Sequence, residues 1–135
     1  MRTILCFGDS NTWGYDPATK GRYPREARWP VVLGRELGPG YEVIAEGLCG
    51  RTTVWEDPVE GDRNGLRHLV PCLESHKPLE LVIIMLGTND LKHRFSATPC
   101  DVAAGAGRLA RTALASAVGP GDGPPQVLLV TPPPL

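Results

Sequence analysis

The sequence lacks a long apolar run and has little excess of charge. No stretch approaches the ~20 apolar residues that a membrane-spanning helix needs. The 14 Lys and Arg residues nearly balance the 15 Asp and Glu residues, for a net charge of −1. We therefore expect no attraction to nucleic acid or to a membrane. The same charge balance favours a small neutral molecule as partner. Since 41% of the residues are hydrophobic, the composition predicts a folded, soluble protein.

Paired cysteine motifs are also absent. The four cysteines are Cys6, Cys49, Cys72 and Cys100. Their wide spacing contains no C-x-x-C pair of the kind found in zinc or redox sites. We expect buried or half-buried free thiols. A nucleophilic role for Cys6 or Cys49 would require an adjacent base, and neither has one in the sequence.

The beginning of the chain does not resemble a secretory leader. Residues 1–2 are followed directly by a short apolar segment, residues 3–7, which is too short for a signal peptide and lacks a small-residue cleavage site. A length of 135 residues suits one domain with a single core. We therefore expect one cytoplasmic domain over residues 1–135.

Four short apolar segments are typical of β-strands: residues 3–7, 41–46, 79–86 and 126–130. Between them, three segments have helical signals. Residues 29–37 carry Pro30 in the first turn and end at Gly38, residues 71–76 form a shorter segment, and residues 102–118 follow a capping-box pattern. In that pattern Thr98 is the N-cap and Asp101 its partner.

Alternation of strands and helices predicts the α/β class, with a three-layer α/β/α, flavodoxin-like parallel sheet. The expected strand order is second, first, third, fourth. Two long loops, residues 16–28 and 55–64, should overhang the carboxyl edge, where such sheets bind ligands. No further element follows residues 126–130 to cover that side of the sheet, so we expect a domain truncated after its fourth strand.

Ser10 directly follows the first predicted strand, in the segment FGDSNTWG. This position places its hydroxyl at the ligand-binding edge, and free N–H groups in such a turn can stabilise an oxyanion. A serine that merely caps a turn fits this segment equally well.

Two further segments are predicted to reach the same edge. Gly50 lies in EGLCGRTT after the second strand, and Asn89 lies in GTND after the third. With the expected strand order, both approach Ser10 from opposite sides. The N–H groups of Ser10 and Gly50 and the amide of Asn89 would then surround one developing negative oxygen, as acyl transfer requires. Taken alone, Asn89 is equally consistent with a turn residue.

Together these blocks resemble those of the SGNH (GDSL-type) hydrolases. ILCFGDSNTWGY, EVIAEGLCGRTT, LELVIIMLGTNDLK and VLLVTPPPL are most similar to the arylesterase and perhydrolase-type acyltransferase branch, over nearly the whole chain. The resemblance implies a Ser10 nucleophile, oxyanion donors from Gly50 and Asn89, and a short-chain carboxylic ester as substrate of the complete protein. It implies no metal and no organic cofactor, and it favours a homo-oligomer.

The same resemblance suggests which residues line the substrate pocket. Asp9 and Trp13 flank the nucleophile, and Thr88 matches a small residue of the acyltransferase branch that favours short acyl groups. Packing is the simpler explanation for Trp55. Arg51 would either contact a carboxylate or anchor its loop, and the sequence does not decide between these roles.

The catalytic acid and base are the main departure from the family pattern, in which they belong to a C-terminal D-x-x-H block that this sequence does not contain. Asp90 and His93 have the same spacing, but they directly follow Asn89, so His93 is not expected to reach Ser10. For His68 and His76 we expect solvated helix or loop positions, with His76 favouring a helix C-terminus.

Two other classes of function remain open. A flavodoxin-like module would bind phosphate at residues 10–14, although this turn lacks a glycine-rich fingerprint and leaves Gly50 and Asn89 without a role. A catalytically incomplete relative would serve as a binding subunit. A bound flavin would be visible in the ultraviolet and visible absorbance.

Overall fold

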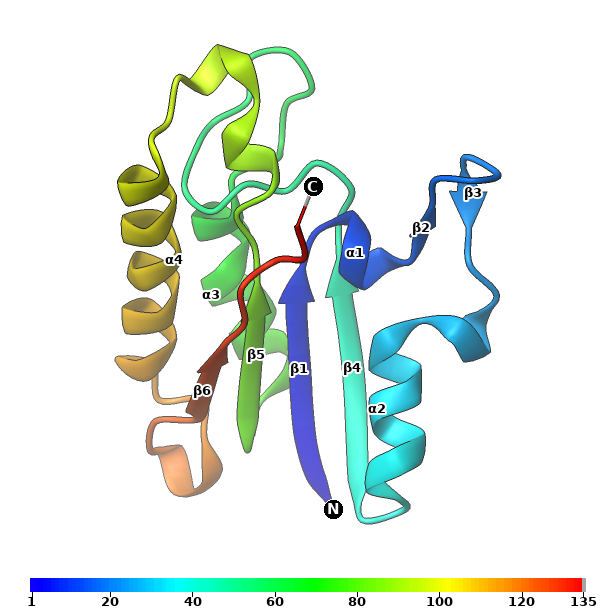
Figure 1. The fold of residues 1–135 in the computed structure, drawn as a ribbon. Helices are drawn as coiled ribbons and strands as arrows, with labels where there is room; N and C mark the ends of the chain where they lie inside the picture. Colours follow the sequence, from blue (N-terminus) through cyan, green and yellow to red (C-terminus); the bar gives the residue numbers. More distant parts are fainter. Residues whose placement is uncertain (135) are drawn as a thin grey trace.

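The computed structural model describes residues 1–134 and contains a parallel four-stranded sheet with helices on both faces (Figure 1). The strands are β1 (Arg2–Gly8), β4 (Tyr41–Gly47), β5 (Leu81–Met85) and β6 (Gln126–Leu129), in the order β4-β1-β5-β6. The predicted α/β class and strand order are confirmed. Because all strand pairs are parallel, the carboxyl ends of the strands share one edge.

Successive residues of β1 enter different cores, since side chains alternate between the faces of a sheet. Leu5 and Phe7 join the larger core beneath α3 (Gly65–His76) and α4 (Pro99–Leu114). The other fully buried leucine, isoleucine and valine side chains of this core are Leu69, Leu73, Leu79, Val82, Ile84, Leu86 and Leu109. Ile4 and Cys6 face the opposite layer, α2 (Trp29–Leu37).

The predicted ends of two helices are largely confirmed. Helix α2 has the predicted bounds, with Pro30 in its first turn and Gly38 as its C-cap. The capping box of α4 joins Thr98 and Asp101 as predicted. Its predicted end at residue 118 is wrong, because the chain leaves the helix after Leu114 and turns Val118 into the core, where its carbonyl accepts the N–H of Leu79 at 2.7 Å.

Helix α3 is longer than the predicted segment, residues 71–76. It starts at Gly65, where the Asn64 side chain accepts the N–H of Leu66 at 3.0 Å. A glycine is required because a Cβ at this position would lie 2.9 Å from the carbonyl oxygen of Thr53. Pro71 is therefore inside the helix and not at its start.

Short elements make up the rest of the chain. They are α1 (Ser10–Trp13), the hairpin strands β2 (Tyr15–Asp16) and β3 (Gly21–Arg22), and the 3-10 helices η1 (Arg25–Ala27), η2 (Asn89–Leu91), η3 (His93–Phe95) and η4 (Pro120–Asp122). The hairpin lies within residues 16–28, which the sequence presented as a plain loop. Among residues 1–134, no helix is long and apolar enough to cross a membrane.

Strand β6 lies at one edge of the sheet, and its apolar side chains are unusually exposed. Leu128 is 48% exposed and Leu129 is 44% exposed. An apolar groove flanks β6 on each side, with volumes of about 520 Å³ beside Trp29 and about 420 Å³ beside α4.

The prediction of buried or half-buried thiols is wrong for one cysteine. Cys100 is exposed because it lies in the first turn of α4, whereas the other three cysteines are buried or half-buried.

Candidate active site

Ser10 is the first residue of α1 and directly follows the carboxyl end of β1. Its turn is held by Asp9, whose side chain accepts the N–H of Asn11 at 2.9 Å. At the other end of α1, the N–H of Gly14 donates to the Ser10 carbonyl at 2.8 Å, with Gly14 at φ 101°. The half-buried Ser10 side chain is therefore presented at the edge of the sheet by a short, fixed turn.

Gly50 lies in the turn that follows β4. Its φ of 85° is in the left-handed region, and a Cβ would lie 2.7 Å from the Glu60 carboxylate and 3.1 Å from Nε of Arg63. The backbone conformation favours glycine at this position, and any larger residue would also displace the ends of the Glu60 and Arg63 side chains.

Asn89 begins η2 after β5, and its side-chain Nδ2 donates to the Arg51 carbonyl at 3.0 Å. Since β1 lies between β4 and β5, this bond joins the two segments that flank the strand carrying Ser10. The structure thus brings the turns of Gly50 and Asn89 together at the carboxyl end of the sheet.

Three hydrogen-bond donors in these turns are unused. Within residues 1–134, the backbone N–H groups of Ser10 and Gly50 donate to no acceptor. The Asn89 amide uses one of its N–H groups on Arg51, which leaves the other free. Unpaired donors at the ends of three adjacent strands are suited to binding a negatively charged oxygen.

The Arg51 side chain connects the ends of β1 and β4. Its buried guanidinium donates from Nη1 to the carbonyls of Glu46 at 2.7 Å and Gly8 at 3.2 Å, and lies 4.1 Å from the ring centroid of Phe7. Of the two roles that the sequence left open, contact with a carboxylate or anchoring of the loop, the structure supports anchoring, because both hydrogen bonds go to backbone carbonyls. Burial lowers the pKa of Arg51.

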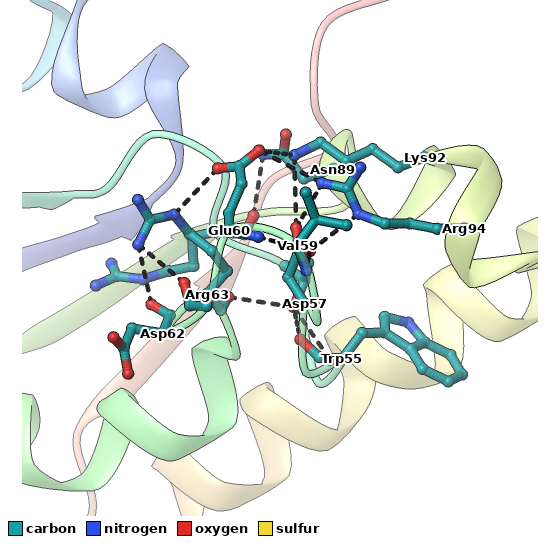
Figure 2. A network of polar contacts seen from close by, with 12 residues as sticks. Trp55, Asp57, Val59, Glu60, Asp62, Arg63, Asn89, Lys92 and Arg94 are labelled. Atoms are coloured by element: carbon teal, nitrogen blue, oxygen red, sulfur yellow. Dashed lines mark hydrogen bonds and ion pairs between the residues drawn. The ribbon is translucent and has the colours of Figure 1, made fainter.

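A network of ion pairs ties the loop of residues 55–64 to the segment after Asn89 (Figure 2). Arg94 donates twice to Asp57, at 2.9 and 2.7 Å, and Lys92 donates to Glu60 at 2.8 Å. The hydrogen bonds from Arg94 hold the pKa of Asp57 well below its usual range. Glu60 also lies against Gly50. The network therefore connects the turn of Gly50 with the segment after Asn89, the two residues that carry free donors. Sequence reasoning missed it, since its charged partners are more than 30 positions apart.

Comparison with known proteins agrees with this geometry. The profile of the GDSL-like lipase/acylhydrolase family matches residues 6–134. The chain belongs to this family. The predicted resemblance to SGNH hydrolases is thereby confirmed, although no curated protein matches the chain.

Several solved structures of SGNH-type esterases are similar to this chain. An aryl esterase from M. smegmatis is 50% identical with a TM-score of 0.93, and Est24, a carbohydrate acetylesterase from Sinorhizobium meliloti, is 49% identical with the same TM-score. Both alignments cover 100% of this chain and 66% of the other. The SGNH-hydrolase family esterase AlinE4 is more distant, at 27% identity and a TM-score of 0.60 over 82% of this chain and 52% of its own. The chain therefore spans just under two thirds of the first two esterases.

The D-x-x-H spacing of Asp90 and His93 does not form a dyad in this GDSL-like domain. The buried Asp90 carboxylate accepts the N–H of Thr53 at 2.9 Å and also the Thr53 hydroxyl, while His93 is exposed. Burial raises the pKa of Asp90. No hydrogen bond joins Asp90 to His93 among the described residues.

The other two histidines, His68 and His76, are not placed as a base for Ser10 either. His68 lies in the middle of α3. His76 ends α3, as predicted, but the expectation of a solvated position is wrong, because its side chain is only 27% exposed and its Nε2 lies 2.9 Å from the Glu46 carboxylate.

The residues predicted to line the pocket differ in exposure. Asp9 is 1% exposed, and burial raises its pKa. Trp13 is half-buried beneath Arg22, whose guanidinium lies 4.4 Å from the centroid of the Trp13 ring. Thr88 is half-buried directly before Asn89. Trp55 stacks on Phe95 at 6.4 Å, in agreement with the packing role expected for it.

We expect Arg51→Met to destabilise the fold, because it removes the side-chain donor shared by the Gly8 and Glu46 carbonyls. The Gly8 carbonyl then keeps only the Leu48 N–H among the donors in the described residues. The expected loss in the free energy of unfolding is about 1–3 kcal/mol, measured by urea denaturation. Arg67→Met is the matched control, since its side chain is 71% exposed and, in the described part of the chain, pairs only with Glu56. Equal losses for the two variants would contradict the anchoring role of Arg51.

Proposed function

We propose that the complete protein is a serine esterase or acyltransferase that acts on short-chain carboxylic esters through a Ser10 acyl-enzyme. The observation that carries this proposal is the group of unused donors at Ser10, Gly50 and Asn89, on three adjacent strand ends. Family membership supports it, since the solved relatives include an aryl esterase and a carbohydrate acetylesterase.

In the proposed reaction, the Ser10 hydroxyl oxygen attacks the ester carbonyl carbon while a histidine base removes its proton. The carbonyl oxygen becomes negatively charged and accepts hydrogen bonds from Gly50, Asn89 and the Ser10 N–H. Collapse of this intermediate expels the alcohol, which takes the proton from the base. Water, an alcohol or a peroxide then attacks the acyl-enzyme and releases Ser10.

We assign different roles to the three proposed pocket residues. Trp13 and Thr88 line the acyl pocket beside Ser10 and Asn89, and the small side chain of Thr88 suits short acyl groups. Asp9 holds the nucleophile turn, since a carboxylate that is 1% exposed and accepts the N–H of Asn11 is not available to a substrate.

We propose that the base of this mechanism lies outside residues 1–135, in the part of the relatives that this chain does not cover. Among the described residues, His68 lies in the middle of α3, His76 is paired with Glu46 and His93 is exposed. The exposed leucines of β6 and the grooves beside it are surfaces that further chain would cover. We propose that residues 1–135 form the N-terminal portion of one SGNH domain, completed by a D-x-x-H block. The cytoplasmic location and the homo-oligomer stay predictions.

The proposed function is tested with the full-length protein and 4-nitrophenyl esters of increasing acyl length. We expect fastest turnover for acetyl or another short acyl group. A burst of nitrophenolate, stoichiometric with protein, is expected where deacylation limits the rate. Absence of hydrolysis by folded full-length protein would favour a binding subunit.

We expect Asn89→Ala to lower kcat more than it raises KM, because the free N–H of its amide acts mainly on the oxyanion of the transition state. The loss in kcat should be about 10²–10³-fold. Steady-state kinetics of the full-length variant provides the measurement. An unchanged kcat would instead mean that Asn89 only fastens its turn to Arg51.

A further inference from the structure

A second cluster of reactive side chains lies between α3 and β4 and has no part in the proposed reaction. It consists of Glu46, Cys72 and His76, all half-buried. One potential ligand atom from each residue lies within 4.8 Å of the other two. Glu46 and His76 are already in contact, with the carboxylate oxygen 2.9 Å from Nε2.

Regular secondary structure brings the three side chains together. Cys72 and His76 are four positions apart in α3 and therefore share one face of the helix. Glu46 is two positions after Ile44 in β4, so both side chains point to the same side of the sheet, where Ile44 packs on the larger core. The cluster is thus fixed by a helix and a strand.

A thiolate, an imidazole and a carboxylate are the ligand types that zinc prefers. Bond lengths of about 2.0–2.3 Å place tetrahedral ligand atoms roughly 3.3–3.8 Å apart. Closing the cluster from its present separations requires shifts of roughly 1 Å, which side-chain rotations can supply. We propose that Glu46, Cys72 and His76 form a three-ligand site for zinc or a similar divalent metal, which ties α3 to β4. Water occupies the fourth position.

Charge balance is compatible with this site. Metal binding releases the Cys72 proton to solvent, so that the thiolate and the Glu46 carboxylate together neutralise a divalent ion. In the metal-free protein, burial raises the pKa of Cys72 to about 12, and the site holds a thiol beside the His76–Glu46 hydrogen bond. The Arg51 cation nearby is held by the Phe7 ring and by backbone carbonyls, including that of Glu46.

Titration of the full-length protein with Co²⁺ tests the proposal. We expect a sulfur-to-cobalt charge-transfer band in the near ultraviolet and tetrahedral d–d bands in the visible, both removed when Zn²⁺ displaces the cobalt. Cys72→Ser should abolish the charge-transfer band. Glu46→Gln and His76→Gln should each raise the dissociation constant for Co²⁺ at least about tenfold.

Matched variants separate this site from other thiols, other histidines and the esterase site. Cys100→Ser, His68→Gln and Ser10→Ala should leave the cobalt spectrum unchanged. Zn²⁺ should also protect Cys72 of the unaltered protein from alkylation, as mapped by mass spectrometry, which requires no variant to fold. Absence of the bands, their survival in Cys72→Ser, or alkylation of Cys72 that Zn²⁺ does not slow would overturn the proposal.

Discussion

Ser10→Ala in the full-length protein should lower kcat for a short aryl ester by on the order of 10⁶, the scale of removing a serine nucleophile. The fold should be retained, because the Ser10 hydroxyl makes no hydrogen bond within residues 1–134 and the turn is held by Asp9 and Gly14. The measurement is initial-rate hydrolysis at saturating ester, with circular dichroism to confirm folding.

Ser75→Ala is the matched control, since among residues 1–134 this exposed hydroxyl donates only to the Cys72 carbonyl in α3. It should retain full activity. Substantial turnover by correctly folded Ser10→Ala protein would refute the assignment of the nucleophile.

Residues 1–135 alone should hydrolyse the same ester at no more than a residual rate, although Ser10, Gly50 and Asn89 are all present. A serine hydroxyl without a base is a weak nucleophile, and oxyanion donors alone supply only a small part of the catalysis. The shorter chain should also unfold at lower temperature than the full-length protein, because Leu128 and Leu129 lie on an unprotected edge strand.

The comparison requires both chain lengths, each with its Ser10→Ala variant, assayed after folding is confirmed. Activity in the full-length protein only is the expected result. Equal, Ser10-dependent activity in residues 1–135 would contradict it. Asp90 and His93 would then be the leading candidates for acid and base. Asp90 would first have to break its hydrogen bonds with Thr53.

The sheet and its ligand-binding edge were predictable because they depend on local patterns. Continuous apolar runs such as residues 81–86 identify strands that are buried on both faces, and Pro30 and Gly38 mark the ends of α2. Because the strands of this class are parallel, the segments that carry Ser10, Gly50 and Asn89 all reach the carboxyl edge of the sheet, and the expected strand order makes them neighbours there.

Features that depend on long-range contacts were not predictable. The Asp57–Arg94 pair joins residues 37 positions apart, and the start of α3 depends on a close approach of Gly65 to Thr53. The Cys72–His76 spacing is visible in the sequence, but its third partner, Glu46, is supplied by the packing of α3 on β4. Neither helical periodicity nor motif spacing encodes such partners.

Covalent labelling tests the central claim most directly. The full-length protein is treated with an activated phosphonate ester, which traps serine nucleophiles, and then analysed by intact-mass measurement and peptide mapping. We predict one phosphonyl group per chain, attached to Ser10 and absent from the Ser10→Ala variant. Labelling of Cys49 or another residue in place of Ser10, or equal labelling of the Ser10→Ala variant, would contradict the assignment of Ser10 as the nucleophile.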